Sequence, residues 1–371
     1  MRVLYFSQDY TPHDYRFMSA MGEAGDEVHY LRLERRRNLE SRPLPSGVDL
    51  VDWWGGTRRI TWTDMPRLLF ELRGLLGRLK PDLVHAGPIQ RCALPISLLG
   101  FRPLVSMSWG SDLLADARRG AGKAAAAFTL GRSAVLIADC QAVRQAAIAM
   151  GMRKDRIVVF PWGVDLDHFR RIGPSRLRGN LGWEEAFVLL STRAWEPIYG
   201  VDLVAEGFCR AARSDPRLRL LMLGGGSLED MLHRKFDQEG VADRVHMAGQ
   251  IDFDRLPEFY NAADLYLSAS HTDGSSVSLL EAMACGLPAL VSDIPGNREW
   301  VEPGKNGWWF TDGVVEELID GIGQAAAHAD LASLGKQGRL VAESRADWSR
   351  NAGKIRVAYR LALNGRDGGE A

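Results

Sequence analysis

A succession of strand, turn and helix occurs twice along the chain, and this repetition limits the fold more than any other feature. Short apolar runs such as Arg2–Ser7 and Leu104–Met107 alternate with segments of helical periodicity such as Pro66–Lys80. Such alternation predicts a parallel sheet that is covered by helices on both faces. After Pro161–Gly163 the pattern begins again with Phe187–Ser191, so we predict an α/β chain with two sheets.

A chain of 371 residues is too long for one ordinary core and has the right length for two domains. We predict that residues 1–163 form the first domain and residues 164–346 the second. A last helix within about 347–371 has no strand after it, and we expect it to pack back on the first domain. Ligand sites of such sheets lie beyond the carboxyl ends of the strands. Two such domains that face each other would enclose an interdomain cleft.

The composition is that of an ordinary globular protein, with 46% apolar and 25% charged residues. No apolar run approaches the length of a membrane helix, and the first residues are too short a segment for a signal peptide. The four cysteines show no C-x-x-C spacing and lie in apolar surroundings, which favours reduced thiols. We therefore expect a cytoplasmic protein.

The two halves of the chain differ in charge. Residues 1–160 hold 23 Lys/Arg and 16 Asp/Glu, whereas the remainder holds 23 and 31. The basic half would suit an anionic membrane surface or a phosphorylated acceptor, although two halves of any chain often differ by chance. The charged run Glu34–Arg37 fits a solvated loop equally well. Pro66–Lys80 has a basic and an apolar face, and we favour a helix that covers the sheet over one that lies on a bilayer.

The stretch Asp273–Gly286, D-G-S-S-V-S-L-L-E-A-M-A-C-G, follows a strand-like run and ends at a helix stop. Ser275 or Ser276 would cap the helix, whose free backbone N–H groups would form an anion site. Asp273 and Glu281 flank that site. A phosphate cradle between two carboxylates that can accept from hydroxyls is what a sugar nucleotide needs.

The residues from Ser268 to Gly307 resemble the large family of retaining nucleotide-sugar glycosyltransferases with the GT-B fold, of the group 1 and family 4 type. In that family a carboxylate, seven residues and then Glu stand at the start of a helix; Asp273 fills the first place, where Glu is commoner, and Glu281 the second. Weaker matches cover nearly the whole chain, and they are Pro81–His85, Trp109–Asp112, Pro161–Asp165, Thr192–Arg193, Leu223–Gly226, Ala248–Gln250 and Ala263–Asp264.

The resemblance implies that the second domain binds the donor and the first the acceptor. It implies that Glu281 binds the ribose hydroxyls, that Asp273 meets the donor sugar and that the start of the helix holds the diphosphate. We predict catalytic roles for Asp273, Arg193 and His13. The predicted donor-binding residues are Glu281, Gly274, Ser275, Ser276, Arg193, Tyr199, Gly225 and Gln250.

Arg193 follows a predicted strand, so we expect it at the carboxyl edge of the sheet, where a guanidinium can bind diphosphate. The alternative is an ion pair with Glu196 on the same loop. The family usually has a Lys shortly afterwards, before a Gly, and here Tyr199 stands before Gly200. Gly224–Gly226 fits a phosphate loop or a plain tight turn.

The first loop departs from the family's frequent Gly-Gly and offers His13, Asp14 and Arg16 instead. His13 would touch the donor phosphate or deprotonate the acceptor, and the alternative is an exposed His13 beside an Asp14 that caps a helix. Trp109 stands where the family often has His, before Gly110 and Asp112. We list Trp109, Asp112, Asp14 and Arg16 as facing the acceptor or the sugar, and we favour a core position for His85.

We predict transfer of a sugar from an NDP-sugar, UDP or GDP, to an acceptor hydroxyl with retention of configuration. The acceptor would be a glycan, a lipid-linked or a small molecule of glycan or polysaccharide biosynthesis, with peripheral membrane contact through the basic half and no nucleic acid. We expect no cofactor. We also expect no metal, because no cluster of His, Cys and carboxylates has the spacing of metal ligands. Asp252 and Asp254 form an Asp-x-Asp pattern, but on a segment that in the family lies near the base. The alternatives are an epimerase-like enzyme of the same fold and a two-lobed sugar-binding protein without catalysis.

Overall fold

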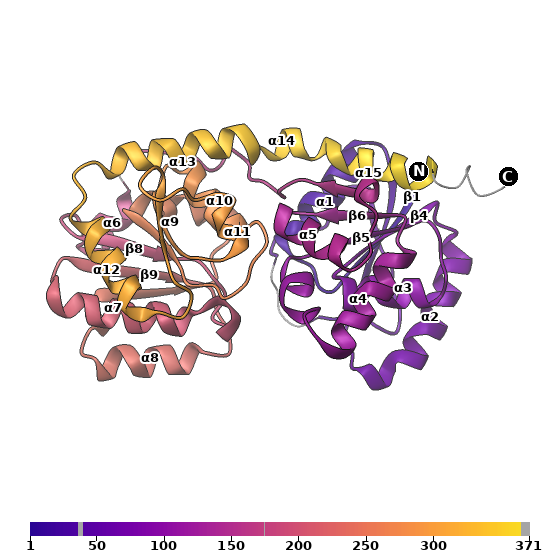
Figure 1. Ribbon diagram of the computed structural model, residues 1–371, viewed down its shortest axis with the longest axis horizontal. Helices are drawn as coiled ribbons and strands as arrows, with labels where there is room; N and C mark the ends of the chain where they lie inside the picture. Colours follow the sequence, from indigo (N-terminus) through magenta and orange to yellow (C-terminus); the bar gives the residue numbers. More distant parts are fainter. Residues whose placement is uncertain (36–39, 174, 365–371) are drawn as a thin grey trace. The chain divides into compact units, whose positions relative to one another are not determined.

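The computed structural model describes residues 1–35, 40–173 and 175–364, and the chain divides into two compact units. Unit 1 comprises Met1–Trp162 and Ser349–Ala371, and unit 2 comprises Gly163–Trp348 (Figure 1). Each unit contains one parallel sheet with helices around it. The chain is therefore α/β with two sheets, as the sequence predicts.

The sheet of unit 1 has seven parallel strands in the order β3-β2-β1-β4-β5-β6-β7. Strand β1 lies inside the sheet and pairs with two neighbours, so that Val3 lies opposite Val28 on one side and Leu83 on the other. The strands are β1 (Arg2–Ser7), β2 (Glu27–Arg32), β3 (Val48–Leu50), β4 (Leu83–Gly87), β5 (Leu104–Met107), β6 (Val135–Ala138) and β7 (Ile157–Val159). The helices are α1 (Pro12–Glu23), α2 (Met65–Leu79), α3 (Leu94–Leu98), α4 (Gly120–Arg132), α5 (Gln141–Ala149) and α15 (Gly353–Asn364).

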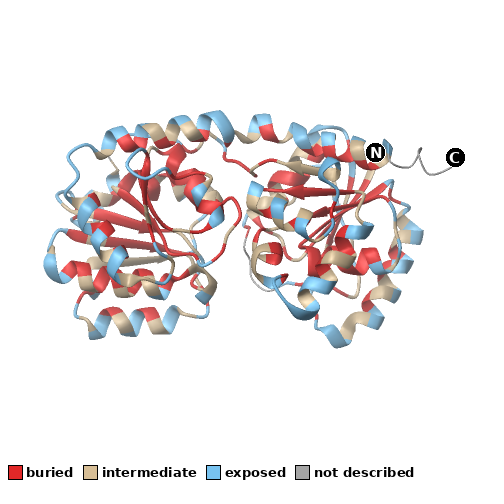
Figure 2. Ribbon diagram, in the orientation of Figure 1, coloured by how far each residue is buried: buried red, intermediate tan, exposed pale blue. Residues whose placement is uncertain are grey.

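The central strands of unit 1 are buried on both faces because helices cover the sheet on both sides (Figure 2). Helix α2 shows how the sequence pattern achieves this. Its Leu68, Leu72 and Leu75 are buried in the core, while the opposite side of the helix is exposed. The interpretation of this segment as a covering helix is therefore confirmed.

The C-terminal helix α15 lies against β5, β6 and β7 of unit 1. Tyr359 on this helix is buried, and its hydroxyl is 2.8 Å from Nδ1 of His85 on β4. His85 is also fully buried, and burial lowers its pKa to about 3, so that the ring is neutral. The core position favoured for His85 is confirmed.

The sheet of unit 2 has six parallel strands in the order β10-β9-β8-β11-β12-β13. The strands are β8 (Phe187–Ser191), β9 (Leu218–Leu223), β10 (Val245–Gly249), β11 (Leu265–Ser268), β12 (Ala289–Ser292) and β13 (Gly307–Phe310). The helices are α6 (Arg176–Leu181), α7 (Val201–Ser214), α8 (Glu229–Gln238), α9 (Leu256–Ala262), α10 (Val277–Ala284), α11 (Pro295–Arg298), α12 (Val315–Ala326), α13 (Leu331–Arg345) and α14 (Trp348–Asn351), the last of which ends in unit 1.

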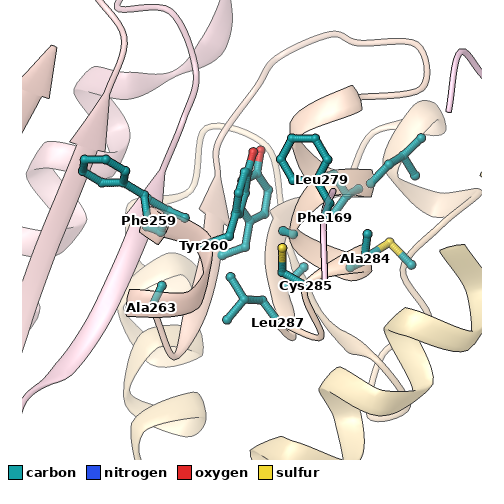
Figure 3. Packing of buried hydrophobic residues seen from close by; sticks show 14 of the residues in the cluster. Phe169, Phe259, Tyr260, Ala263, Leu279, Ala284, Cys285 and Leu287 are labelled. Atoms are coloured by element: carbon teal, nitrogen blue, oxygen red, sulfur yellow. The ribbon is translucent and has the colours of Figure 1, made fainter. Parts of the chain in front are cut away.

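One of the hydrophobic cores of unit 2 surrounds helix α10. Figure 3 shows Leu279, Cys285 and Leu287 from this region with Phe169 and Tyr260, all of which are buried. Helix α10 also packs against α13. The helix that carries the predicted donor site is thus embedded in the core and cannot shift without disturbing it.

Helix α1 begins at Pro12, and Thr11 caps it. Two expectations about the elements are wrong. The last helical segment is two helices, α14 and α15, rather than one. The short strands β3, β7, β12 and β13 were not expected.

We predict that Tyr359→Phe lowers the free energy of unfolding by about 1–3 kcal/mol, because the buried Nδ1 of His85 loses its partner. Urea unfolding followed by fluorescence would measure this. Tyr10→Phe is the control, since the Tyr10 hydroxyl bonds Pro43 at an exposed position. Equal stability of both variants would show that the contact does not hold α15 in place.

Candidate functional site

Loops that follow three strands of unit 2 bring the predicted donor-binding residues together. Arg193 follows β8, Gly224–Gly226 follows β9, and Asp273 follows β11. These strands are parallel, so their carboxyl ends lie at one edge of the sheet. Arg193 is where the sequence predicts it.

The guanidinium of Arg193 joins this loop to the start of helix α10. Its Nη2 lies 2.7 Å from Oδ2 of Asp273. Its Nη1 donates to Oγ of Ser276 at 2.8 Å and to Oγ of Ser278 at 3.1 Å. The ion pair with Glu196, considered as the alternative from sequence, is not the one that forms. Arg193 instead orders the residues predicted to surround the diphosphate.

Tyr199 explains how the site accommodates a buried Arg without the family's Lys. The centre of the guanidinium lies 4.2 Å from the centroid of the Tyr199 ring, which is cation–π geometry. Burial alone would lower the pKa of Arg193, but the Asp273 carboxylate and nearby tyrosines raise it above its usual value. Arg193 therefore stays charged. The aromatic ring of Tyr199 stands at the sequence position where the family usually has a Lys.

Glu281 is positioned by a buried tyrosine. The Glu281 residue lies on α10 and is 7% exposed. The Tyr260 hydroxyl donates to its Oε2 at 2.8 Å. Burial and, after it, the Glu281 charge raise the pKa of Tyr260, so this hydroxyl keeps its proton and orients the carboxylate.

The expected capping of α10 by a serine side chain is wrong for Ser276. Ser276 occupies the N-cap position, but its side chain makes no capping hydrogen bond. Its hydroxyl accepts from Arg193 instead. The hydroxyl of Ser275 accepts from the Trp300 indole at 3.3 Å. Gly274 donates its backbone N–H to Oδ1 of Asp273, which holds the carboxylate close to the loop.

The glycine loop after β9 packs against the chain segment that carries Arg193. Trp195 donates its backbone N–H to the Gly225 carbonyl at 3.1 Å. A Cβ on Gly226 would lie 2.2 Å from the Trp195 carbonyl, so that only glycine fits there. Gln250 follows β10 and is exposed. A packing reason thus accounts for this loop, whereas the sequence left a turn and a phosphate loop open.

In unit 1 His13 lies among indole rings. Its ring centroid is 4.7 Å from that of Trp162 and 6.2 Å from that of Trp109. His13 is in the first turn of α1 and is half-buried, not exposed. Arg16, one turn further on, is buried. Trp109 follows β5 at the carboxyl edge of the sheet.

Asp14 and Asp112, which the sequence predicts to face the acceptor or the sugar, have hydrogen-bond partners within the protein. Asp14 is fully buried and accepts from the Tyr5 hydroxyl and from the Thr11 N–H. Asp112 accepts from the N–H groups of Ile89 and Trp109 at 2.9 and 3.0 Å. Burial raises the pKa of each to about 6 against these hydrogen bonds. We therefore assign both carboxylates to holding the loops at the sheet edge.

Unit 1 also contains a cavity of about 760 Å³ at this edge of its sheet. Its lining combines indole rings and small apolar side chains with several polar groups. The residues are Gln8, Trp62, Pro88, Gln90, Arg91, Leu94, Trp109, Ser111, Asp112, Asp116, Ala121, Gly122 and Ala125. The sequence had singled out only Trp109 and Asp112 among them. Gln8 and Gln90 each come soon after a strand, which is the signal that would have found them.

Arg36 and Arg37 of the basic run lie outside the described residues. In the ranges 1–35, 40–173 and 175–364, no group of three or more His, Cys, Asp or Glu side chains is arranged to hold a metal ion. Over the same ranges, no helix has the length and apolar character needed to cross a membrane.

Two parallel sheets of this kind, each with polar loops at its carboxyl edge, define a two-unit Rossmann-like protein of the GT-B type. Family models match both units: "Glycosyltransferase Family 4" over residues 13–168 and "Glycosyl transferases group 1" over residues 176–353. The chain belongs to the GT-B glycosyltransferase family.

Similar proteins include a D-inositol 3-phosphate glycosyltransferase of Geodermatophilus obscurus, 30% identical over 59% of this chain and 50% of the relative. The chain thus spans about half the length of this curated relative. Among solved structures, Anabaena Alr3699/HepE in complex with UDP and glucose has a TM-score of 0.80 at 21% identity, covering 97% of this chain and 99% of that one. Sucrose-phosphate synthase from Thermosynechococcus elongatus has a TM-score of 0.78 at 17% identity, covering 98% and 100%.

We predict that Tyr199→Ala lowers the free energy of unfolding by about 0.5–2 kcal/mol, because Arg193 loses the ring beneath it. Tyr199→Phe keeps the aromatic face and should remain close to the parent protein. Urea unfolding of the two variants would measure the difference. If Tyr199→Phe loses as much as Tyr199→Ala, the tyrosine hydroxyl rather than the ring supports the site.

Proposed function

We propose that the protein is a retaining glycosyltransferase that moves a sugar from an NDP-sugar to an acceptor hydroxyl. UDP and GDP were the nucleotides expected from sequence, and the complexes of Alr3699/HepE with UDP and with UDP-glucose favour UDP. The observation that carries the proposal is the cluster formed by Arg193, Asp273 and the start of α10, with Glu281 on the same helix. Unit 2 binds the donor and unit 1 the acceptor.

In the proposed donor complex, Glu281 accepts from the ribose hydroxyls and Asp273 from hydroxyls of the sugar. Arg193 and the loop of Gly274, Ser275 and Ser276 bind the diphosphate. Preorganised charge of this kind stabilises the negative charge that grows on the leaving group. No metal or cofactor is part of the proposal, because the charge of Arg193 lies where the leaving group would develop its own.

The proposed reaction breaks the bond between the anomeric carbon and the phosphate oxygen and forms a bond to the acceptor oxygen on the same face. The acceptor proton passes to the departing diphosphate. Arg193 stabilises that diphosphate, and His13 lies in unit 1, where the acceptor is bound. The protein contributes position and charge rather than a covalent intermediate.

Glu281→Gln should weaken UDP binding about 10- to 100-fold, since charge-assisted hydrogen bonds to the ribose are lost. The amide oxygen can still accept from Tyr260, so the core should be preserved. Calorimetry with UDP would measure the affinity, and Glu185→Gln, an exposed acid of the same unit, is the control. Unchanged affinity in a folded Glu281→Gln protein would contradict the ribose role.

Arg193→Ala should reduce turnover about 100- to 1000-fold, because the stabilisation is needed most when the bond breaks. Release of UDP that depends on an added acceptor would measure turnover, with Arg213→Ala as a surface control. NMR of the product would give the anomeric configuration. An inverted product would refute retention, and UDP release without any acceptor would favour an enzyme other than a transferase.

We also propose that unit 1 contacts an anionic membrane surface peripherally, at the cytoplasmic side. Phe70 on α2 is 78% exposed, beside the exposed Arg67, Arg73 and Arg78 of the same helix. An exposed aromatic among basic side chains suits a lipid surface, although α2 also covers the sheet.

Vesicles with anionic lipid should sediment the protein at low salt and release it at high salt. The expected attraction is about 1 kcal/mol for each basic residue near the surface, and salt screens it. Phe70→Ala should weaken binding more than Leu340→Ala, an exposed apolar residue of unit 2. Equal and negligible binding to neutral and anionic vesicles would exclude the membrane contact.

A further inference from the structure

The cavity of unit 1 presents hydrogen-bond acceptors rather than free cations. Gln8 donates its Nε2 to the Glu34 carboxylate at 2.7 Å, and Gln90 donates its Nε2 to the Asp112 carbonyl at 2.7 Å. Both partners can only accept, which settles the orientation of each amide. The carbonyl oxygens of Gln8 and Gln90 therefore have no partner within the described part of the chain. They can accept hydrogen bonds from a ligand.

The acidic groups of the cavity outweigh its one cation. Arg91 donates to Oε1 of the fully buried Glu34 at 3.2 Å and to the Ile60 carbonyl at 3.0 Å. The charge of Arg91 is thus compensated within the protein. Asp116 adds an exposed carboxylate, and Asp112 a buried one. Two buried donors of the lining, Arg91 Nε and Trp109 Nε1, have no partner among the described residues. The acceptors and carboxylates outnumber them, so a phosphate, which only accepts at neutral pH, would meet mainly acceptors and negative charge here.

The remaining lining is apolar and aromatic. Trp62 is 59% exposed, and Trp109 is half-buried. Ala121 and Ala125 of α4 add small apolar side chains to the lining. An indole face packs well against the C–H face of a sugar-like ring, whose hydroxyls donate at its edge. A cavity of about 760 Å³ falls within the range that holds a whole small ligand.

We propose that this cavity binds the acceptor as an uncharged, hydroxyl-bearing ring, such as a neutral glycoside, and selects against a phosphorylated one. The ring packs against Trp62 and Trp109, and its hydroxyls donate to Gln8, Gln90 and Asp116. This inference rests on the proposed function, because only a transferase would use the bound ring as an acceptor. Binding of the ring to the cavity does not itself require sugar transfer.

Binding measured without any donor tests the inference apart from the reaction. The matched probes are myo-inositol and D-inositol 3-phosphate, which share a ring and differ by the phosphate, together with p-nitrophenyl β-D-glucopyranoside as the neutral glycoside. Calorimetry should show binding of the glycoside, and myo-inositol should bind at least as tightly as its phosphate. Tighter binding of the phosphate, or no binding of the glycoside, would overturn the proposal.

Two variants locate the binding. Trp62→Ala should weaken glycoside binding about threefold to tenfold, because one stacking face is lost. Ala121→Trp should abolish it by filling the cavity from the exposed side of α4. Leu98→Ala, at an exposed apolar residue of unit 1 outside the cavity, should leave it unchanged. Glycoside binding that survives both cavity variants would place the ligand elsewhere.

UDP binding in the same protein separates this inference from the proposed function. Glycoside binding that depends on Trp62 without UDP binding would leave the cavity assignment intact and remove the transferase. UDP binding combined with preference for the phosphorylated ring would keep the transferase and remove this assignment.

Discussion

The buried guanidinium of Arg193 joins segments that are far apart in the sequence. It pairs with Asp273 from the loop after β11, donates to Ser276 and Ser278 at the start of α10, and rests on Tyr199 from its own loop. A buried charge is costly unless it is paired and hydrogen-bonded. The neighbouring loops of unit 2 are therefore shaped around one cation, and the carboxyl edge of the sheet becomes a charged site instead of a set of independent loops.

In unit 1 the buried charged groups at the sheet edge are carboxylates. Asp14 and Asp112 are buried at the carboxyl edge of its sheet. Asp14 accepts from Tyr5 of β1 and from the N–H of Thr11, and Asp112 accepts from the backbone N–H groups of Ile89 and Trp109. Burial raises the pKa of both carboxyl groups, and the hydrogen bonds that they accept oppose this rise. The rigid loops in turn carry Trp109 and Gln90, which line the cavity.

Strands with a strong apolar pattern were predictable from the sequence, and so was the placing of Arg193 and Asp273 at one sheet edge. Strands β1, β5 and β8 have the predicted bounds. Short edge strands such as β3 and β13 were missed, because their pairing depends on a neighbour and not on local periodicity. The partners of Arg193 were not predictable either, since the nearest acid in sequence, Glu196, bonds Ser227 instead.

By itself the sequence determined the class of fold and the types of residue at the strand ends, because both follow from local patterns of apolar and polar residues. Tertiary structure alone decided which polar side chains are available to a ligand. Asp14 and Asp112 accept hydrogen bonds from within the fold, and Asp112 also lines the cavity, whereas Gln8, Gln90 and Trp62 come together only when distant loops meet. The physical reason is that burial and hydrogen-bond pairing depend on neighbours in space.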